Sequence, residues 1–471
     1  MLRRRVGQTV TCCSHAIRRR WLWQCSTFTS PSPTALLDEL EQDVANHPPS
    51  TVTVFALSKN VPQELVPSFR RTLAPSGLTT TAIGCLSEVL PVDTSECAAP
   101  SSSKQPQELF SISLARHRSA RDTERAIPFR SALLGRPNIA LGREIKPEHQ
   151  TDHDQLDSGL EAFLKGGAWG FGEQTQAETD ALPEIAELRD EDPSSVRELV
   201  VLTADRIQPF LAALSRFSGA STVGMVGTST PFHAPDGAAY SLFYGEESAS
   251  AGAVGVAVVD AAADHRSKRF SLSYGGLAPV GEAYQVTSAQ GNIVLSLSGQ
   301  NAARLLLNAV NDLFGTSAAN LPAAQRTHEK EKEFYAAIFD SEPKFPLDLG
   351  QARLVARIMA GDPSRGAMSV ETEEEVKRGS YIVFLHQPDS ASGAVVLSNL
   401  AENQLAFVAV TPSDVGPHRS ASECPAQGVV EAPRHFLAAS ENGVVFSAGV
   451  SGPARPPPRV CAIEGSTASL Q

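Results

Sequence analysis

The chain has few aromatic residues for its length. Aromatic side chains make up 6% of its 471 residues, whereas glycine (34) and proline (32) are plentiful. This balance disfavours a helical bundle and favours strands of small residues, many turns and some unstructured insertions. Because 42% of the residues are hydrophobic, the chain can still bury substantial cores, and its length suffices for two or three domains. We expect a soluble globular protein.

Long apolar runs and metal-binding patterns are missing as well. No apolar run reaches the roughly 18–20 residues that a membrane span requires, and the best candidate, 251–263, is short and contains Asp260. None of the seven cysteines forms a CxxC pair or stands at ligand spacing from a histidine. His149 and His153 are four residues apart, but their polar surroundings lack helical periodicity. The sequence therefore predicts no membrane association, no metal site and no disulfide framework.

Motifs that would identify an enzyme or a cofactor site are also lacking. There is no GxSxG sequence, and Ser87, Ser229 and Ser248 have no neighbouring partner whose role the sequence fixes. The glycine-rich residues 163–174 resemble a dinucleotide loop only superficially, because no strand precedes them and no helical pattern follows. We expect no cofactor, and the sequence leaves open whether the protein is an enzyme.

The N-terminal segment contains six arginines but no acidic residue before Asp38. This composition is typical of a mitochondrial transit peptide, and a disordered basic tail is the alternative. We assign residues 1–33 to a transit peptide and expect the mature protein in the mitochondrial matrix. The net charge of −12 becomes more negative without these arginines, which disfavours nucleic acid and anionic lipid as partners.

Two stretches of the chain repeat the same order of elements. Residues 51–60 read as a strand, an amphipathic helical pattern follows, and residues 79–88 (TTTAIGCLSE) form a second strand ending in glycine and cysteine. Residues 198–232 repeat this order. Each stretch predicts a βαβ-like unit with parallel strands and a covering helix. The predicted fold class is α/β to α+β, with mixed β-sheets, covering helices and a strand-rich C-terminal domain.

Glycines at the predicted strand ends suggest a ligand-binding crevice. Open α/β sheets bind ligands outside the carboxyl ends of their strands, although Gly84 and Gly227 could each serve only a tight turn. If the two units lie side by side, their glycine-tipped ends form one polar hollow. The candidate ligand-binding residues at these ends are Gly84, Cys85, Ser87, Gly227, Thr228, Ser229 and His233.

The segment GEESASAGAVG (245–255) joins two apolar runs and is longer than a minimal two-residue hairpin. Its backbone amides could hold a carboxylate, and its acidic side chains could hold an amine. The alternative is an exposed loop whose acidic residues are solvated. The candidate ligand-binding residues here are Gly245, Glu246, Ser248 and Gly252.

The C-terminal half alternates strands and glycine turns. Residues 300–314 form an amphipathic helix ended by Gly315, and residues 328–340 predict another helix with a charged face. Residues 352–387 predict three strands, and residues 451–471 form a Pro-rich tail.

With this order of elements the chain resembles the FIST family, named for F-box and intracellular signal transduction proteins. The resemblance rests on AIGCLSE (82–88), SLFYGEESASAGAVGVAVV (241–259), GNIVLSLSGQNAARLLLNAVND (291–312), VARIMAGDPSRGAMSV (355–370) and VKRGSYIVFLHQ (376–387). It implies an N-terminal FIST domain over 50–260, with a flexible insertion near 93–107, and a C-terminal FIST domain over 270–450. The first fifty residues leave too little chain for an F-box.

The resemblance implies a sensory protein that binds small molecules such as amino acids. Two alternatives remain: an enzyme with dispersed catalytic residues that acts on a small metabolite, and a protein-interaction scaffold with a broad apolar surface. A small-molecule ligand is the expected partner, and the sequence does not identify protein partners.

Overall fold

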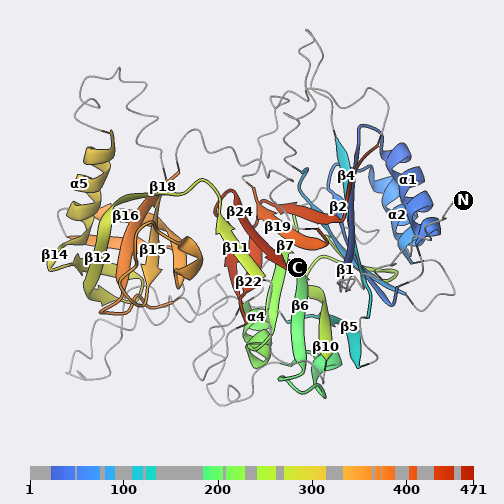
Figure 1. Ribbon diagram of the computed structural model, residues 1–471, viewed down its shortest axis with the longest axis horizontal. Coiled ribbons are helices and arrows are strands. Elements are labelled where there is room, and N and C mark those ends of the chain that lie inside the picture. The colour runs from blue at the N-terminus through green and yellow to red at the C-terminus, as the bar shows by residue number, and fades with distance from the viewer. Residues whose placement is uncertain are drawn as a thin grey trace, which may run out of the picture.

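The computed structural model consists of two lobes dominated by strands, an α+β architecture (Figure 1). One lobe carries the helices α1, α2 and α4, and the other carries α5. The described residues are 23–47, 50–74, 80–90, 109–119, 123–133, 184–204, 208–228, 241–260, 270–314, 333–362, 366–372, 374–387, 402–410, 429–449 and 458–470.

The first lobe begins with a four-stranded unit that we call repeat 1. Its elements are β1 (Trp23–Ser30), α1 (Pro33–Asn46), β2 (Val52–Ser58), η1 (Gln63–Leu65), α2 (Val66–Leu73), β3 (Thr81–Ser87) and β4 (Phe110–His117). β2 and β3 are parallel, and β4 lies between β1 and β2, antiparallel to both. Because a parallel pair needs a crossover, α2 connects β2 to β3.

Repeat 2 has the same strand order and directions. Its elements are β5 (Glu124–Ser131), η4 (Ala186–Leu188), β6 (Val196–Thr203), α4 (Gln208–Leu214), η5 (Ser215–Phe217), β7 (Ser221–Val226) and β10 (Ala253–Asp260). β6 and β7 are parallel, and β10 lies between β5 and β6, antiparallel to both. The two predicted βαβ units are therefore confirmed, and each belongs to a larger unit that also includes a preceding and a following strand.

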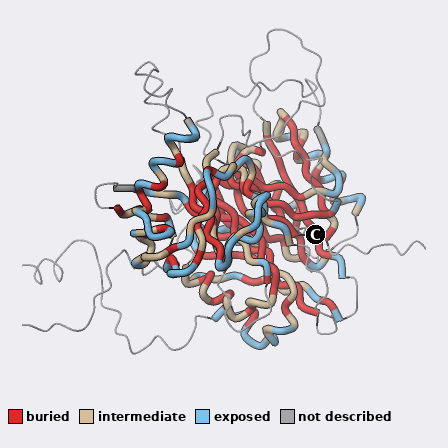
Figure 2. Tube along the Cα trace, turned by 60° about the vertical axis from the view of Figure 1, so that its left-hand side comes forward, coloured by how far each residue is buried: buried red, intermediate tan, exposed pale blue. Residues whose placement is uncertain are grey.

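The sheets of the two repeats pack against each other, and the helices cover their outer faces. Apolar residues of both sheets share one core, which includes Val54, Cys85, Leu202 and Met225. The opposite face of the first sheet packs against α1 and α2, and that of the second against α4. Figure 2 shows the buried residues gathered along these strands in the interior of the molecule.

The second lobe is a ring of strands closed upon itself. Its elements are β12 (Ala278–Gln290), β13 (Ile293–Leu297), β14 (Gln300–Asn301), α5 (Ala302–Phe314), β15 (Phe334–Phe339), η7 (Leu349–Gln351), β16 (Leu354–Asp362), β17 (Ala367–Val370) and β18 (Tyr381–His386). The order is β12-β18-β15-β16-β17-β13, and β13 also pairs with β12, which closes the ring. One apolar core joins α5 to the ring strands.

The last part of the chain returns to the first lobe. Its strands are β19 (Gln404–Ala409), β20 (Val430–Pro433), β21 (His435–Ser440), β22 (Val444–Ser447), β23 (Arg459–Cys461) and β24 (Ser466–Leu470). With β11 (Phe270–Tyr274), three of them form a sheet ordered β11-β24-β19-β21. β22 pairs with β7 just as the early hairpin strand β8 (Leu242–Tyr244) pairs with β3. A strand from the far end of the chain therefore completes the sheet of repeat 2.

Several predicted boundaries differ from the structure. β1 lies inside residues 1–33, the predicted leader, and Trp23 is 1% exposed; a cleaved leader has to end before Trp23 if this strand is to remain. The predicted tail 451–471 contains β23 and β24, which are held by pairing with β22, β11 and β19. The predicted domain 270–450 also differs, because β20 and β22 belong to the sheets of the first lobe.

Two further expectations are wrong or lie outside the described residues. The segment predicted as a helix over 328–340 contains the strand β15, whose residues are nearly all buried between β16 and β18. The predicted flexible insertion near 93–107 lies outside the described residues. Among the helices that the structure describes, none has the length and apolar character needed to cross a membrane.

Candidate functional site

The carboxyl ends of β2, β3 and β7 converge at one place in the first lobe. The amide of Thr228, just beyond β7, donates to the carbonyl of Leu86 in β3 at 3.1 Å. The amide of Lys59, just beyond β2, donates to the carbonyl of Ser87 at 2.9 Å. The end of β21 reaches the same place, because the Ser440 hydroxyl donates to the carbonyl of Val226 at 2.5 Å. Strand ends from both repeats and from the C-terminal sheet therefore adjoin.

Five polar residues meet at these strand ends, and we call them the Lys59 cluster: Lys59, Glu88, Thr228, Glu441 and Asn442. The Lys59 ammonium contacts the Glu88 carboxylate and lies 3.1 Å from Oε2 of Glu441. The Thr228 hydroxyl donates to Oε1 of Glu88 at 2.9 Å. The side-chain amide of Asn442 donates to the carbonyl of Gly227 at 2.9 Å. One cation, two carboxylates and two neutral polar groups are thus placed together.

The two carboxylates of the cluster are shielded from water, whereas the lysine is partly accessible. The exposed fraction of the side chain is 4% for Glu88, 9% for Glu441 and 32% for Lys59. Burial raises the pKa of Glu88, and the hydrogen bond to Glu441 raises it further, while Lys59 and Thr228 act in the opposite direction. Burial works to lower the pKa of Lys59, but its ion pairs with both glutamates outweigh this and leave that pKa raised. The site therefore favours positive charge or an added proton.

Three of the predicted ligand-binding residues lie at this site. Ser87 and Thr228 are buried, and Gly227 donates its amide to the carbonyl of Thr203 at 2.6 Å. Two others lie within β3 and not at its end. A side chain at Gly84 would meet the ring of Phe55 at 2.4 Å, so this glycine is needed for packing. Cys85 is fully buried, and burial strongly raises its thiol pKa, which disfavours a nucleophilic role. Ser229 and His233 lie outside the described residues.

The predicted long loop at Gly245 is instead a tight hairpin. β8 pairs with β9 (Glu247–Ala249) through a two-residue turn at Gly245 and Glu246, where Gly245 has a φ of +54°. The amide of Gly245 donates to the carbonyl of Ala82 at 2.8 Å, which places the turn at the amino end of β3. Ser248 is exposed on β9. These three residues therefore lie away from the Lys59 cluster.

Gly252 lies apart from that hairpin. Its carbonyl accepts from the amide of Ala204 at 2.8 Å, directly beyond the carboxyl end of β6. A Cβ atom on Gly252 would lie 2.2 Å from the carbonyl oxygen of Ser131. Both its φ of +89° and this close approach disfavour any residue with a side chain at this position, which explains why a glycine is found there.

The charged members of the cluster were not identified from the sequence. Lys59 and Glu88 each directly follow a buried strand, which is a usable signal in a fold that binds ligands at strand ends. Glu441 and Asn442 follow β21 in the same way. The sequence does not, however, show that β21 ends beside β2 and β3.

A second buried polar group lies between the two repeats. The Trp23 indole donates to Oε2 of Glu198 at 3.1 Å, and Nε2 of His117 lies 3.2 Å from Oε1 of Glu124. The rings of Trp23 and His117 meet edge to face with centroids 5.4 Å apart. Burial, with a smaller contribution from the Glu124 charge, raises the pKa of Glu198 to about 7, against the effect of the Trp23 hydrogen bond. The Glu198 carboxyl can therefore change its charge near neutral pH.

In the described part of the chain, no group of three or more His, Cys, Asp and Glu side chains could hold a metal ion.

Residues 123–300 match the family model described as the FIST N domain. The matched region begins at β5 and extends through repeat 2 into the first strands of the second lobe. A search of the curated proteins finds no significant match.

Proposed function

We propose that this chain, in which residues 123–300 match the FIST N domain, a small-ligand-binding domain of signal transduction, is a sensory protein for an amino-acid-like metabolite. The ligand binds at the Lys59 cluster. The observation that carries the proposal is the placement of one ammonium and two shielded carboxylates where strand ends of both repeats adjoin.

The charges of the cluster favour a ligand with an amine. Glu88 and Glu441 both contact Lys59, and their proximity to each other contributes to the raised pKa of Glu88. A second cation would relieve this repulsion, because an opposite charge within about 4–6 Å stabilises an ionised carboxylate. A ligand ammonium between the two glutamates supplies that cation.

Replacement of Lys59 by the ligand amine as the partner of the glutamates also makes room for a ligand carboxylate. When a ligand amine pairs with the glutamates, Lys59 becomes available for the negatively charged end of the ligand. Its side chain is 32% exposed, so it lies on the side of the cluster that solvent can reach. The Thr228 hydroxyl and the Asn442 amide are the neutral groups beside this position. A zwitterionic ligand pairs with the two glutamates through its amine and with Lys59 through its carboxylate. A simple anion can pair only with Lys59.

The Arg-rich leader supports a mitochondrial location for this sensor. A leader consistent with the fold ends before Trp23, the first residue of β1. Fusing residues 1–22 to a fluorescent protein and imaging the cells tests this directly. Diffuse fluorescence outside mitochondria would contradict the location.

Thermal unfolding with candidate ligands tests the binding site. The full chain is screened with the twenty amino acids, simple amines and organic acids. We expect one or more amino acids to raise Tm, because a ligand at one hundred times its Kd stabilises the folded state by about 2.7 kcal/mol. Lys59→Met and Glu441→Gln should abolish the shift, whereas the exposed second-lobe variant Lys377→Met should retain it.

Each negative outcome has a distinct meaning. If no amino acid or amine raises Tm, the proposed ligand class is wrong. If a ligand stabilises the wild type and both cluster variants equally, the ligand binds elsewhere. Incubating the stabilising amino acid with the protein and following it by NMR separates a sensor, which leaves it unchanged, from an enzyme, which converts it.

A further inference from the structure

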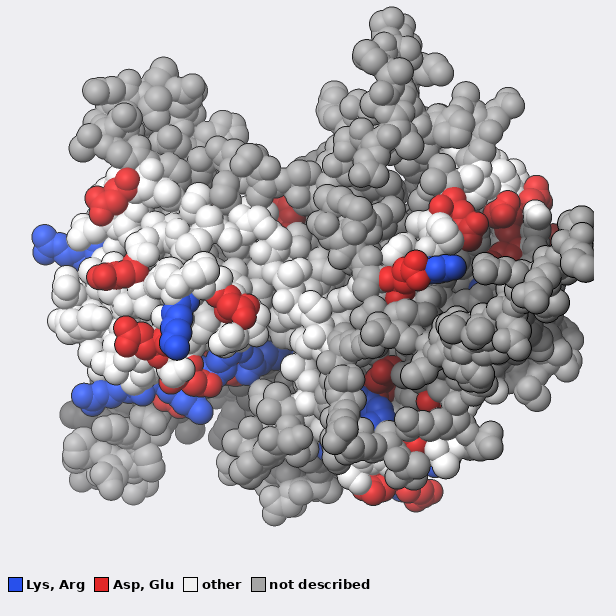
Figure 3. Space-filling model, in the orientation of Figure 1, with Lys and Arg blue, Asp and Glu red and all other residues white. Residues whose placement is uncertain are grey.

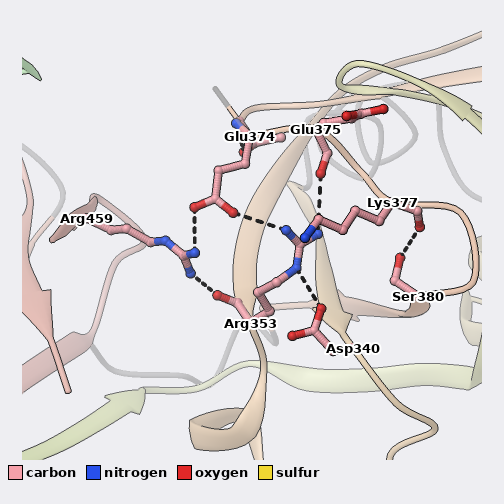
Figure 4. A network of polar contacts seen from close by, with 8 residues as sticks. Asp340, Arg353, Glu374, Glu375, Lys377, Ser380 and Arg459 are labelled. Carbon is pink, nitrogen blue, oxygen red and sulfur yellow. Dashed lines mark hydrogen bonds and ion pairs between the residues drawn. The ribbon is translucent and has the colours of Figure 1, made fainter. Parts of the chain in front are cut away.

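A network of ion pairs joins the second lobe to β23 of the first lobe (Figure 4). Glu374 lies between two arginines: its Oε2 is 3.1 Å from Nη1 of Arg353, and its Oε1 is 2.5 Å from Nη2 of Arg459. Arg459 also donates to the carbonyl of Arg353. Arg353 precedes β16 in the second lobe, whereas Arg459 belongs to β23. We call Arg353, Glu374 and Arg459 the clamp.

The clamp is directly connected to the strand that leaves the Lys59 cluster. Residues 441–443 form the turn between β21 and β22, and this turn carries Glu441 and Asn442. β22 pairs with β7 on one side and with β23 on the other, where Phe446 is opposite Arg459. One short strand thus lies between the cluster and the clamp.

The turn at residues 441–443 also packs closely against β23. Gly443 has a φ of +104°, and a Cβ atom there would lie 2.7 Å from the carbonyl oxygen of Cys461. Its own carbonyl accepts from the amide of Val226 at 3.0 Å. Because well-packed elements shift together and do not deform freely, a displacement of the turn is passed to both β7 and β23.

We propose that the Glu441–Gly443 turn and the clamp form one mechanical link, through which the Lys59 cluster controls the contact between the two lobes. When Glu441 is held by Lys59, β22 and β23 place Arg459 against Glu374. When Glu441 is displaced, β23 shifts and Glu374 keeps only Arg353. The use of this link to report a ligand rests on the proposed function, but the link itself does not.

Hydrogen exchange measured by mass spectrometry tests the link without any ligand. Glu441→Gln weakens the ion pair to Lys59, and we expect exchange in β23 and in residues 353–358 of the second lobe to rise by about threefold or more. In the double variant with Glu374→Gln, the effect of Glu441→Gln should stop at β23, because the clamp is already open.

The chain offers a matched control on the same lobe. Arg357 and Glu333 form an exposed pair at 2.8 Å, and neither residue belongs to the clamp. Acidic and basic side chains lie interspersed on that lobe (Figure 3). Glu333→Gln should leave the response to Glu441→Gln intact. The proposal is wrong if Glu441→Gln leaves exchange in the second lobe unchanged, or if its effect there persists after Glu374→Gln.

Two features keep the outcome interpretable. Lys59→Met provides a second way to release Glu441 if Glu441→Gln does not fold, with the same expected response. The hydrogen-exchange experiment is carried out without any amino acid, so its result does not depend on the ligand screen. Failure of the ligand screen would therefore not contradict the link, and an unchanged exchange rate would not contradict ligand binding.

Discussion

The hydroxyl of Thr228 donates to the carboxylate of Glu88 at 2.9 Å, and these two residues occupy equivalent positions in the two repeats. Gly84 is opposite Phe55 in repeat 1, and Gly224 is opposite Val201 in repeat 2. Glu88 follows Gly84 by the same number of positions as Thr228 follows Gly224. The repeats therefore meet at corresponding points, where one contributes an acid and the other a hydroxyl.

Replacing Glu441 by glutamine should lower the pKa of Glu88. Both the hydrogen bond to Glu441 and its charge raise that pKa in the wild type, and a neutral amide removes the charge. The change is measured by NMR titration of the glutamate carboxyl carbons. Glu333→Gln, in the second lobe, should leave the Glu88 titration unchanged. A Glu88 pKa that stays as high in Glu441→Gln would show that burial alone determines it.

Alanine should be poorly tolerated at both Gly84 and Gly224. A Cβ atom at Gly84 meets the Phe55 ring at 2.4 Å, and overpacking of this kind costs about 1–3 kcal/mol. At Gly224 it meets the backbone oxygen of Val201 at 1.7 Å, which a side-chain rotation cannot relieve. Gly224→Ala should therefore reduce the free energy of unfolding in urea more than Gly84→Ala does.

Gly227→Ala is the control for this pair. Its nearest atom would be the Thr203 oxygen at 3.3 Å, so a small adjustment accommodates the methyl group. We expect a smaller loss of stability than at either strand glycine. Equal losses at all three positions would contradict the packing account and would suggest a shared backbone requirement.

Glu198 should make the protein less stable as the pH rises from about 4.5 to about 7. Its pKa is 4.5 as a free side chain and about 7 in the folded state, so the folded state holds the proton more tightly between these values. Unfolding is therefore favoured as pH increases, by at most roughly 3 kcal/mol. Stability curves in urea across this range measure the slope, which Glu198→Gln should reduce. An identical slope in that variant would assign the effect to other groups.

The N-terminal boundary of the fold can be tested by truncation. A chain that begins at Trp23 keeps β1, whereas a chain that begins at Thr34 loses a strand paired with both β4 and β20. We expect the first to show a cooperative thermal transition and the second to be unfolded or aggregated. A stable, cooperative protein from Thr34 onward would show that β1 is dispensable.

The parts of the fold that could be predicted are those that depend on local pattern. Alternating strands and an amphipathic helix identified both βαβ units, and apolar spacing identified α5. The sequence predicts a helix at β15 because a charged run precedes it and because its two alanines favour a helix over a strand. Neighbouring strands on both sides decide its conformation.

The candidate site could be predicted only in part for the same reason. Small residues after β3 and β7 pointed to the strand ends, but Lys59 and Glu441 are 382 residues apart and meet only through the fold. A charged residue after a strand is normally solvated, so neither residue stands out in the sequence. The sequence analysis treats Gly84 and Gly227 as equivalent positions of the two repeats. In the structure, the residue of repeat 2 that corresponds to Gly84 is Gly224.

The pairing of β22 with β7 has a consequence for how the protein is made. Repeat 1 receives the equivalent strand, β8, only after β7 has been synthesised, and repeat 2 receives β22 only after the strands of the second lobe. Until then the nascent chain carries β7 as an open sheet edge, with its amides and carbonyls available to other chains. The sheet of repeat 2 therefore cannot be completed until the whole second lobe has been synthesised, and β7 stays available for wrong pairing in that interval.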